Sequence, residues 1–144
     1  MIPRGAQALR DLAMKLAISI APETTSAFAM ANTGMVVMLM QCLAQDYDRA
    51  AEVRSIDIAE MKTLLAQARE SAPKELHAAI DEFIRGQAKS LRISDLDAFH
   101  AQGLELVIRL HEHVERRSDA AANRRIWTYL TQFADRHAFQ LMGI

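Results

Sequence analysis

The stretch SDLDAFHAQGLELVIRLHEHVERR, residues 94–117, shows the helical spacing that recurs along most of this chain. When its residues are placed at 100° intervals around a helix, the polar side chains Gln102, Glu105 and Arg109 share one narrow arc. Nearly all of the remaining positions are apolar, so the buried arc is wider than a helix packed against one layer needs. This width predicts either a central helix or a helix whose second face meets another copy of the chain.

Helical spacing continues on both sides of this stretch, and no segment alternates apolar and polar residues for long enough to indicate a strand. Proline, glycine and capping residues divide the chain into six predicted helices, which cover approximately residues 3–20, 24–54, 55–70, 73–85, 94–117 and 118–141. We expect Ser55 to cap the third helix, with Asp57 in its first turn, and Ser118 to cap the last one.

Three of the predicted helices are long and three are short, and the connections between them are brief. Short connections make consecutive helices antiparallel neighbours. The sequence therefore predicts an all-α fold, a single up-down helical bundle of about six helices, in which residues 1–144 form one domain. The total of 144 residues suits one domain with one hydrophobic core.

The charge pattern favours a soluble, cytoplasmic protein. The formal net charge of −1 supplies no general attraction for nucleic acid or an anionic membrane. The charged residues Asp11 and Lys15 interrupt the segment that a signal peptide would need to keep apolar. Residues 24–45 carry no charge and are long enough to span a bilayer. Because polar side chains such as Asn32 and Gln41 occur in that run, we expect the central helix of a soluble bundle instead of a membrane span.

Two histidines are predicted to meet across the last helical hairpin. If residues 94–117 and 118–141 run antiparallel, positions whose numbers sum to about 236 lie level, which brings His100 close to His137. Asp97 lies three residues before His100 and is expected on the same face. The three side chains could form a metal or proton-transfer site. A further ligand could come from Asp46, Asp48, Glu52 or Glu60. Alternatively, both rings are neutral, hydrogen-bonded and structural.

Three other groups of side chains are candidates for binding. A secondary polar pair consists of His111 and Glu115. An adaptable apolar groove on the uncharged helix, suited to an apolar small ligand, contains Met30, Met35, Met38 and Met40. An anion contact, able to accept phosphate or DNA, is predicted at the turn near residue 118 and contains Arg116, Arg117, Arg124 and Arg125.

We predict no catalytic residues and no cofactor. Cys42, the single cysteine, lies in the apolar run without a nearby positive charge, so its thiol should be unreactive. The chain has no glycine-rich phosphate loop and no Gly-x-Ser-x-Gly elbow. The sequence favours a non-enzymatic interaction or accessory module that forms a homodimer through an apolar face of residues 94–117 or 24–54. The alternatives are a small-ligand- or metal-binding bundle that uses the two histidines and, further, a DNA- or phosphate-binding protein.

Overall fold

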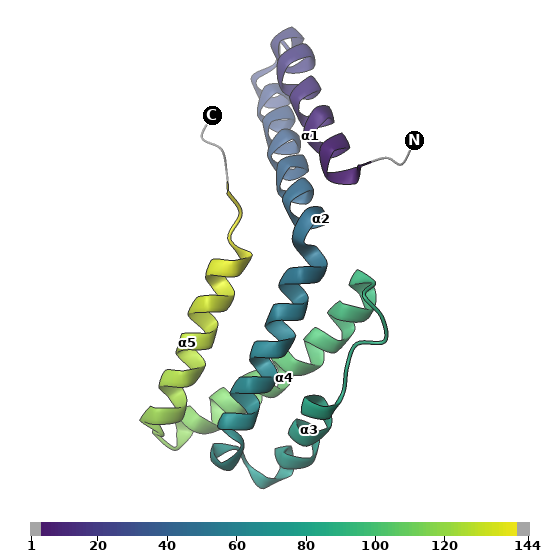
Figure 1. Cartoon of the computed structure of the whole chain (residues 1–144). Coiled ribbons are helices and arrows are strands. Elements are labelled where there is room, and N and C mark those ends of the chain that lie inside the picture. Colours follow the sequence, from purple (N-terminus) through teal and green to yellow (C-terminus); the bar gives the residue numbers. More distant parts are fainter. Residues whose placement is uncertain (1–3, 141–144) are drawn as a thin grey trace. The chain divides into compact units, whose positions relative to one another are not determined.

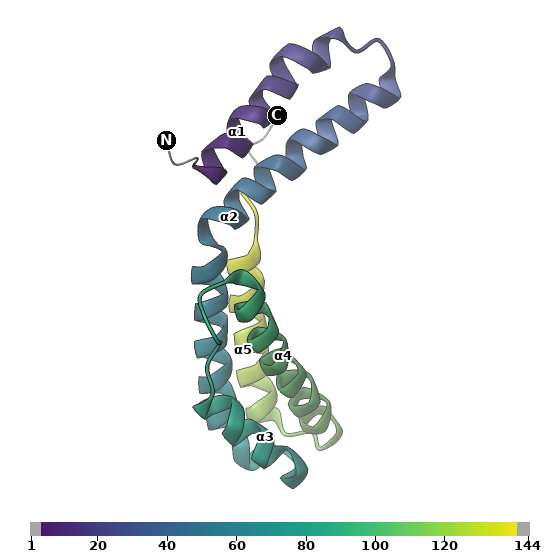
Figure 2. The ribbon, with the colours of Figure 1, turned by 90° about the vertical axis from the view of Figure 1, so that its right-hand side faces the viewer.

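The computed structural model describes residues 4–140, and this part of the chain is helical with no strand (Figures 1 and 2). The prediction of an all-α fold is therefore confirmed. The α-helices are α1 (Gly5–Lys15), α2 (Ala27–Gln67), α3 (Lys74–Arg85), α4 (Ile93–Arg116) and α5 (Ala120–His137). A π-helical segment, Leu16–Ile20, and a short 3₁₀ turn, Ala21–Glu23, follow α1, and a second 3₁₀ turn, Arg69–Ser71, follows α2.

The predicted helix boundary at Ser55 was wrong, because α2 continues through this residue. The Ser55 hydroxyl donates to the carbonyl oxygen of Ala51 at 2.7 Å, inside the helix. A serine that bonds to the carbonyl four residues earlier satisfies its own hydroxyl and does not end the helix. The described residues consequently contain five α-helices where six were predicted, and Asp57 lies in the middle of a helix instead of at its start.

Two other helix starts also test the capping predictions. Ser26 accepts a hydrogen bond from the amide of Ala29 at 3.4 Å at the beginning of α2, in the predicted region. The cap of α5 was predicted one residue too early. Asp119, not Ser118, accepts from the amide of Ala122 at 3.1 Å, whereas Ser118 has a φ of 54° and lies in the turn before the helix. A carboxylate is the stronger acceptor for the free amides of a first turn.

The described residues divide into two compact units, one of residues 4–50 with 139–140 and one of residues 51–138. The hydrophobic core lies in the second unit, where α3, α4, α5 and the last part of α2 pack together. Fully buried side chains from three of these helices include Met61, Leu65, Leu110 and Ile126. Within this unit, α5 runs antiparallel to the last part of α2 (Figure 1).

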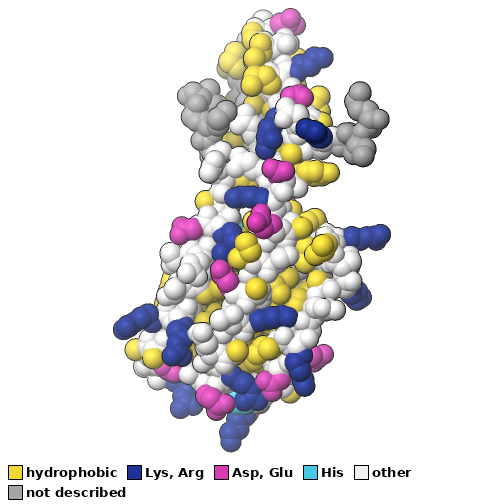
Figure 3. Space-filling view, in the orientation of Figure 1, with side chains coloured by type: hydrophobic (Ala, Val, Ile, Leu, Met, Phe, Trp, Pro, Cys, Tyr) yellow, Lys and Arg dark blue, Asp and Glu magenta, His cyan; other side chains and the backbone are white. Residues whose placement is uncertain are grey.

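The first unit is a helical hairpin, in which α1 runs back along the first part of α2 (Figures 1 and 2). Its buried hydrophobic residues among those described are three alanines, Ala13, Ala44 and Ala50. The larger apolar side chains of both helices are mostly exposed, and part of this apolar surface is visible in Figure 3. Two helices alone therefore leave much of their apolar surface in contact with water.

Candidate functional site around Asp57

The most buried charged side chain of the second unit is Asp57, which has no exposed surface. It lies four residues before Met61 and eight before Leu65, so α2 points all three toward the core. Its Oδ1 accepts from Nε of Arg136 at 2.7 Å. Its Oδ2 lies 2.7 Å from Nε2 of His137 and 3.2 Å from Nε2 of His100. An ionised carboxylate only accepts hydrogen bonds, so both rings donate through Nε2.

The Arg136 guanidinium joins Asp57 to a second carboxylate, that of Glu60. Nη1 donates to Oε1 of Glu60 at 3.0 Å, and Nη2 donates to Oε2. The ring of Phe133 packs against that of His137, with 4.2 Å between the centroids. A buried charge remains tolerable only when it is paired and hydrogen-bonded. We define the Asp57 cluster as six side chains, those of Asp57, Glu60, His100, Phe133, Arg136 and His137.

The structure brings two of the three predicted site residues together and leaves the third outside. His100 and His137 approach the same oxygen, but that oxygen belongs to Asp57 and not to Asp97. Asp97 forms an ion pair with Nε of Arg54, and its side chain is 52% exposed. Sequence reasoning missed Asp57 because the expected cap at Ser55 placed it in a solvated first turn. Its spacing of four residues from Met61 was the signal that could have found it.

The positions of the possible ligand side chains bear on the hypothesis that this site binds a metal ion. Within residues 4–140, no group of three or more His, Cys, Asp or Glu side chains is arranged to hold a metal ion. At the Asp57 cluster, one carboxylate oxygen of Asp57 and both oxygens of Glu60 bind the Arg136 guanidinium. A positive charge that pairs with both carboxylates is therefore supplied by the chain itself.

Tyr129 of α5 lies close to the cluster and is also buried. Its hydroxyl oxygen is inaccessible to solvent and has no hydrogen-bond partner in the described part of the chain. Burial raises the pKa of this phenol, and the nearby Asp57 carboxylate raises it further. The phenol consequently stays protonated and neutral beside the buried ion pairs.

Acidification should weaken folding through His100. Burial lowers the pKa of His100, although the Asp57 carboxylate opposes this shift. In the unfolded chain the imidazole regains a pKa of about 6.5, so below that pH the unfolded state takes up the proton more readily. The contribution of His100 to the free energy of unfolding is therefore complete above about pH 6.5. It is lost as the pH falls from there through the lower pKa of His100 in the folded state. We expect the free energy of unfolding, measured by urea denaturation, to decrease from pH 7 to pH 5.

The same titration in the His100→Gln variant isolates this contribution from that of the other histidines. The decrease should be smaller in the variant than in the unchanged chain. An equal decrease in both proteins would show that His100 does not carry the pH dependence.

The remaining candidate side chains are not members of the Asp57 cluster. In the secondary polar pair, Nε2 of His111 lies 3.4 Å from Oε1 of Glu115 and 3.0 Å from Oδ1 of Asn123. The four arginines of the predicted anion contact are all exposed around the α4–α5 turn, and Arg116 pairs with Glu112. The methionines of the predicted apolar groove lie on α2 in the first unit; Met30, Met35 and Met38 are exposed and Met40 is partly buried.

The geometry of the Asp57 cluster is suited to anchoring helices. Each polar group of Asp57 and Arg136 is bonded to a side chain from another helix, which ties α4 and α5 to α2. Such satisfied networks rigidify a core and specify one packing arrangement. Comparisons of the chain with family models, with curated proteins and with solved structures found no match.

Proposed function

We propose that this chain is a non-enzymatic module that forms a homodimer through the apolar surface of the α1–α2 hairpin. The supporting observation is the exposure of large apolar side chains along both helices of the first unit. They include Leu12, Met14, Ile18, Phe28, Met35, Leu39 and Leu43. An apolar surface of this kind is costly in water and typically marks a site of association.

Between the two interfaces that the sequence left open, the exposures favour α2 over α4. On α4 the apolar residues Leu106, Val107 and Leu110 are buried within the chain's own core. Two large apolar side chains of α4 stay exposed, Ile108 at 66% and Ile93, the first residue of the helix, at 37%. Isolated exposed isoleucines are ordinary for a protein surface. The wide apolar arc of α4 is thus largely used inside one chain.

A second copy of the hairpin is the occupant that best suits this surface. Two helical hairpins placed face to face make a four-helix arrangement, which buries the stripes that one hairpin leaves exposed and completes an up-down bundle. The flexible thioethers of Met35 and Met38 can adapt to such a partner.

A lipid bilayer is the competing occupant, since α2 is long and apolar enough to cross a membrane by length and composition. However, α1 belongs to the same hairpin and carries Arg10, Asp11 and Lys15. A bilayer that received the hairpin would have to accept these charges, at a cost of several kcal/mol. We therefore favour association of two copies in solution.

The Leu39→Glu substitution is expected to dissociate the dimer. Leu39 is 51% exposed in the chain, so a charge there should disturb the monomer little while placing an unpaired carboxylate in the apolar interface. Sedimentation velocity should show a dimer for the unchanged protein and at least a tenfold weaker dimer for the variant. Ile108→Glu, which introduces the same charge at the most exposed large apolar position of α4, should leave the dimer intact.

Two results would overturn this proposal. The first is an unchanged protein that sediments as a monomer at every concentration, and the second is a dimer that Ile108→Glu disrupts while Leu39→Glu does not. Flotation with phosphatidylcholine–phosphatidylglycerol vesicles separates the competing explanation. A monomer that floats with vesicles, and no longer does so after Leu39→Glu, would assign the apolar surface to a membrane.

A further inference from the structure

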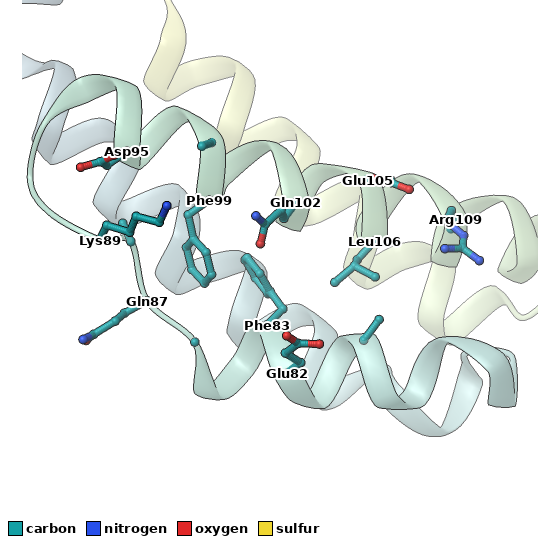
Figure 4. Close-up of a pocket in the computed structure, with 14 residues that line it drawn as sticks. Glu82, Phe83, Gln87, Lys89, Asp95, Phe99, Gln102, Glu105, Leu106 and Arg109 are labelled. Atoms are coloured by element: carbon teal, nitrogen blue, oxygen red, sulfur yellow. The ribbon is translucent and has the colours of Figure 1, made fainter.

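A groove of about 460 Å³ lies between α3 and α4, both within the second unit (Figure 4). Phe83 from α3 and Phe99 and Leu106 from α4 line its floor, and the loop that carries Gln87 and Lys89 borders one end. This volume falls in the range of small-molecule sites, which typically combine an apolar lining with a few polar groups.

The aromatic floor is already assembled in the chain. The rings of Phe83 and Phe99 are stacked with 4.7 Å between centroids, and both residues are buried. Gly103 lets Phe83 lie against α4, because a Cβ at this position would come within 2.4 Å of the ring. Nζ of Lys62 lies 5.5 Å from the centroid of Phe99 and donates to the carbonyl of Gly86 at 2.6 Å. A ligand would thus meet a rigid surface, which keeps the entropic cost of binding low.

Several hydrogen-bonding side chains of the groove lining are not used inside the chain, and three of them lie close to this floor. Gln102 points from α4 toward the ring of Phe83, Glu82 lies beside Phe83 on α3, and Arg109 lies two turns further along α4 (Figure 4). Among residues 4–140, no hydrogen bond or ion pair joins any of these three side chains to another residue. The carboxylate of Glu82 and the guanidinium of Arg109 come from opposite walls. Asp95, Glu105 and Lys89 also line the groove, so it offers groups of both charges.

We propose that this groove binds a small zwitterion with an aromatic body, of which a free aromatic amino acid is the simplest example. The ring of the ligand would pack on Phe83 and Phe99, where aromatic pairs gain more than area alone provides. The ammonium would pair with Glu82 and the carboxylate with the planar fork of Arg109. The amide of Gln102 can donate to the carboxylate or accept from the ammonium. This site is independent of the self-association proposed for the hairpin.

Three indole probes test the charge requirement. L-tryptophan carries both charges, tryptamine carries only the ammonium, and indole-3-propionate carries only the carboxylate. Titrations followed by the amide shifts of α3 and α4 in NMR spectra should give saturable binding of L-tryptophan. Each singly charged probe should bind about tenfold more weakly, because one charge-assisted hydrogen bond is lost.

Two substitutions assign each charge to its partner. Glu82→Gln should weaken the binding of L-tryptophan and of tryptamine by about tenfold, and the affinity for indole-3-propionate should stay unchanged. Arg109→Gln should weaken the binding of L-tryptophan and of indole-3-propionate, and the affinity for tryptamine should stay unchanged. The matched controls are Glu75→Gln on α3 and Arg116→Gln on α4, which lie outside the groove and should leave all three affinities unchanged.

Two titration results would contradict binding of the zwitterion in this groove. L-tryptophan that fails to saturate at millimolar concentration shows that the groove is not such a site. Equal binding of the three probes, unaffected by Glu82→Gln or Arg109→Gln, shows that indole merely partitions onto apolar surface. Far-UV circular dichroism of each variant confirms that a lost affinity reflects a lost contact and not a lost fold.

Discussion

Asp57→Ala is expected to lower the free energy of unfolding by about 3–5 kcal/mol, the range measured when one partner of a buried ion pair is removed. The substitution leaves the Arg136 guanidinium with Glu60 as its remaining partner and removes the acceptor from both His100 and His137. It also leaves a cavity at a position with no solvent exposure. Urea denaturation at pH 7, followed by circular dichroism at 222 nm, measures the change.

Asp97→Ala is the matched control for this experiment, since it removes the same side chain from a partly exposed ion pair with Arg54. Such pairs contribute only about 0–1 kcal/mol, because water screens the charges and the side chains lose entropy on pairing. If Asp57→Ala cost no more than Asp97→Ala, the Asp57 cluster would not be holding α4 and α5 against α2.

Leu110→Ala is expected to cost about 2–5 kcal/mol, through lost transfer energy and the cavity that remains in the core. Leu110 lies on α4, has no solvent exposure and belongs to the core of the second unit. Thermal unfolding followed by calorimetry should show a lower midpoint for the variant, by several degrees.

Ile108→Ala provides the comparison on the same helix, two residues away and 66% exposed in the chain. An exposed substitution of this kind usually changes stability by less than about 0.5 kcal/mol. If the two substitutions lowered the stability equally, α4 would not be oriented with Leu110 toward the core. A loss at Ile108 that depends on protein concentration would instead indicate a contact with a second copy.

The apolar spacing of the chain was sufficient to predict helices and the faces that they bury. Leu106 and Leu110 repeat at one helical turn, and both are buried on α4. Helix ends were harder to predict, because serine can serve either as a cap or as an interior residue. At Ser55 the hydroxyl bonds within α2, and at Ser118 the neighbouring Asp119 supplies the cap. The choice depends on local competition for backbone groups that a residue type alone does not reveal.

One part of the Asp57 cluster, the approach of His100 to His137, could be predicted from the positions of these residues along the chain. An antiparallel hairpin of α4 and α5 brings positions near 100 and 137 to the same level, whatever else the chain does. The carboxylate between the two rings was missed, because Asp57 is 43 residues from His100 and 80 from His137 along the chain. No spacing rule within one helix connects residues so distant.

Helix formation and the direction of an apolar face follow from contacts between residues three and four positions apart, which the sequence displays directly. The partner of a buried histidine depends on the register between separate helices. Packing of whole side chains sets that register, and a shift of one residue would turn Asp57 away from both rings. For this reason the all-α fold could be read from the pattern of residues, whereas the meeting of Asp57, His100 and His137 emerged from the packing of α2, α4 and α5.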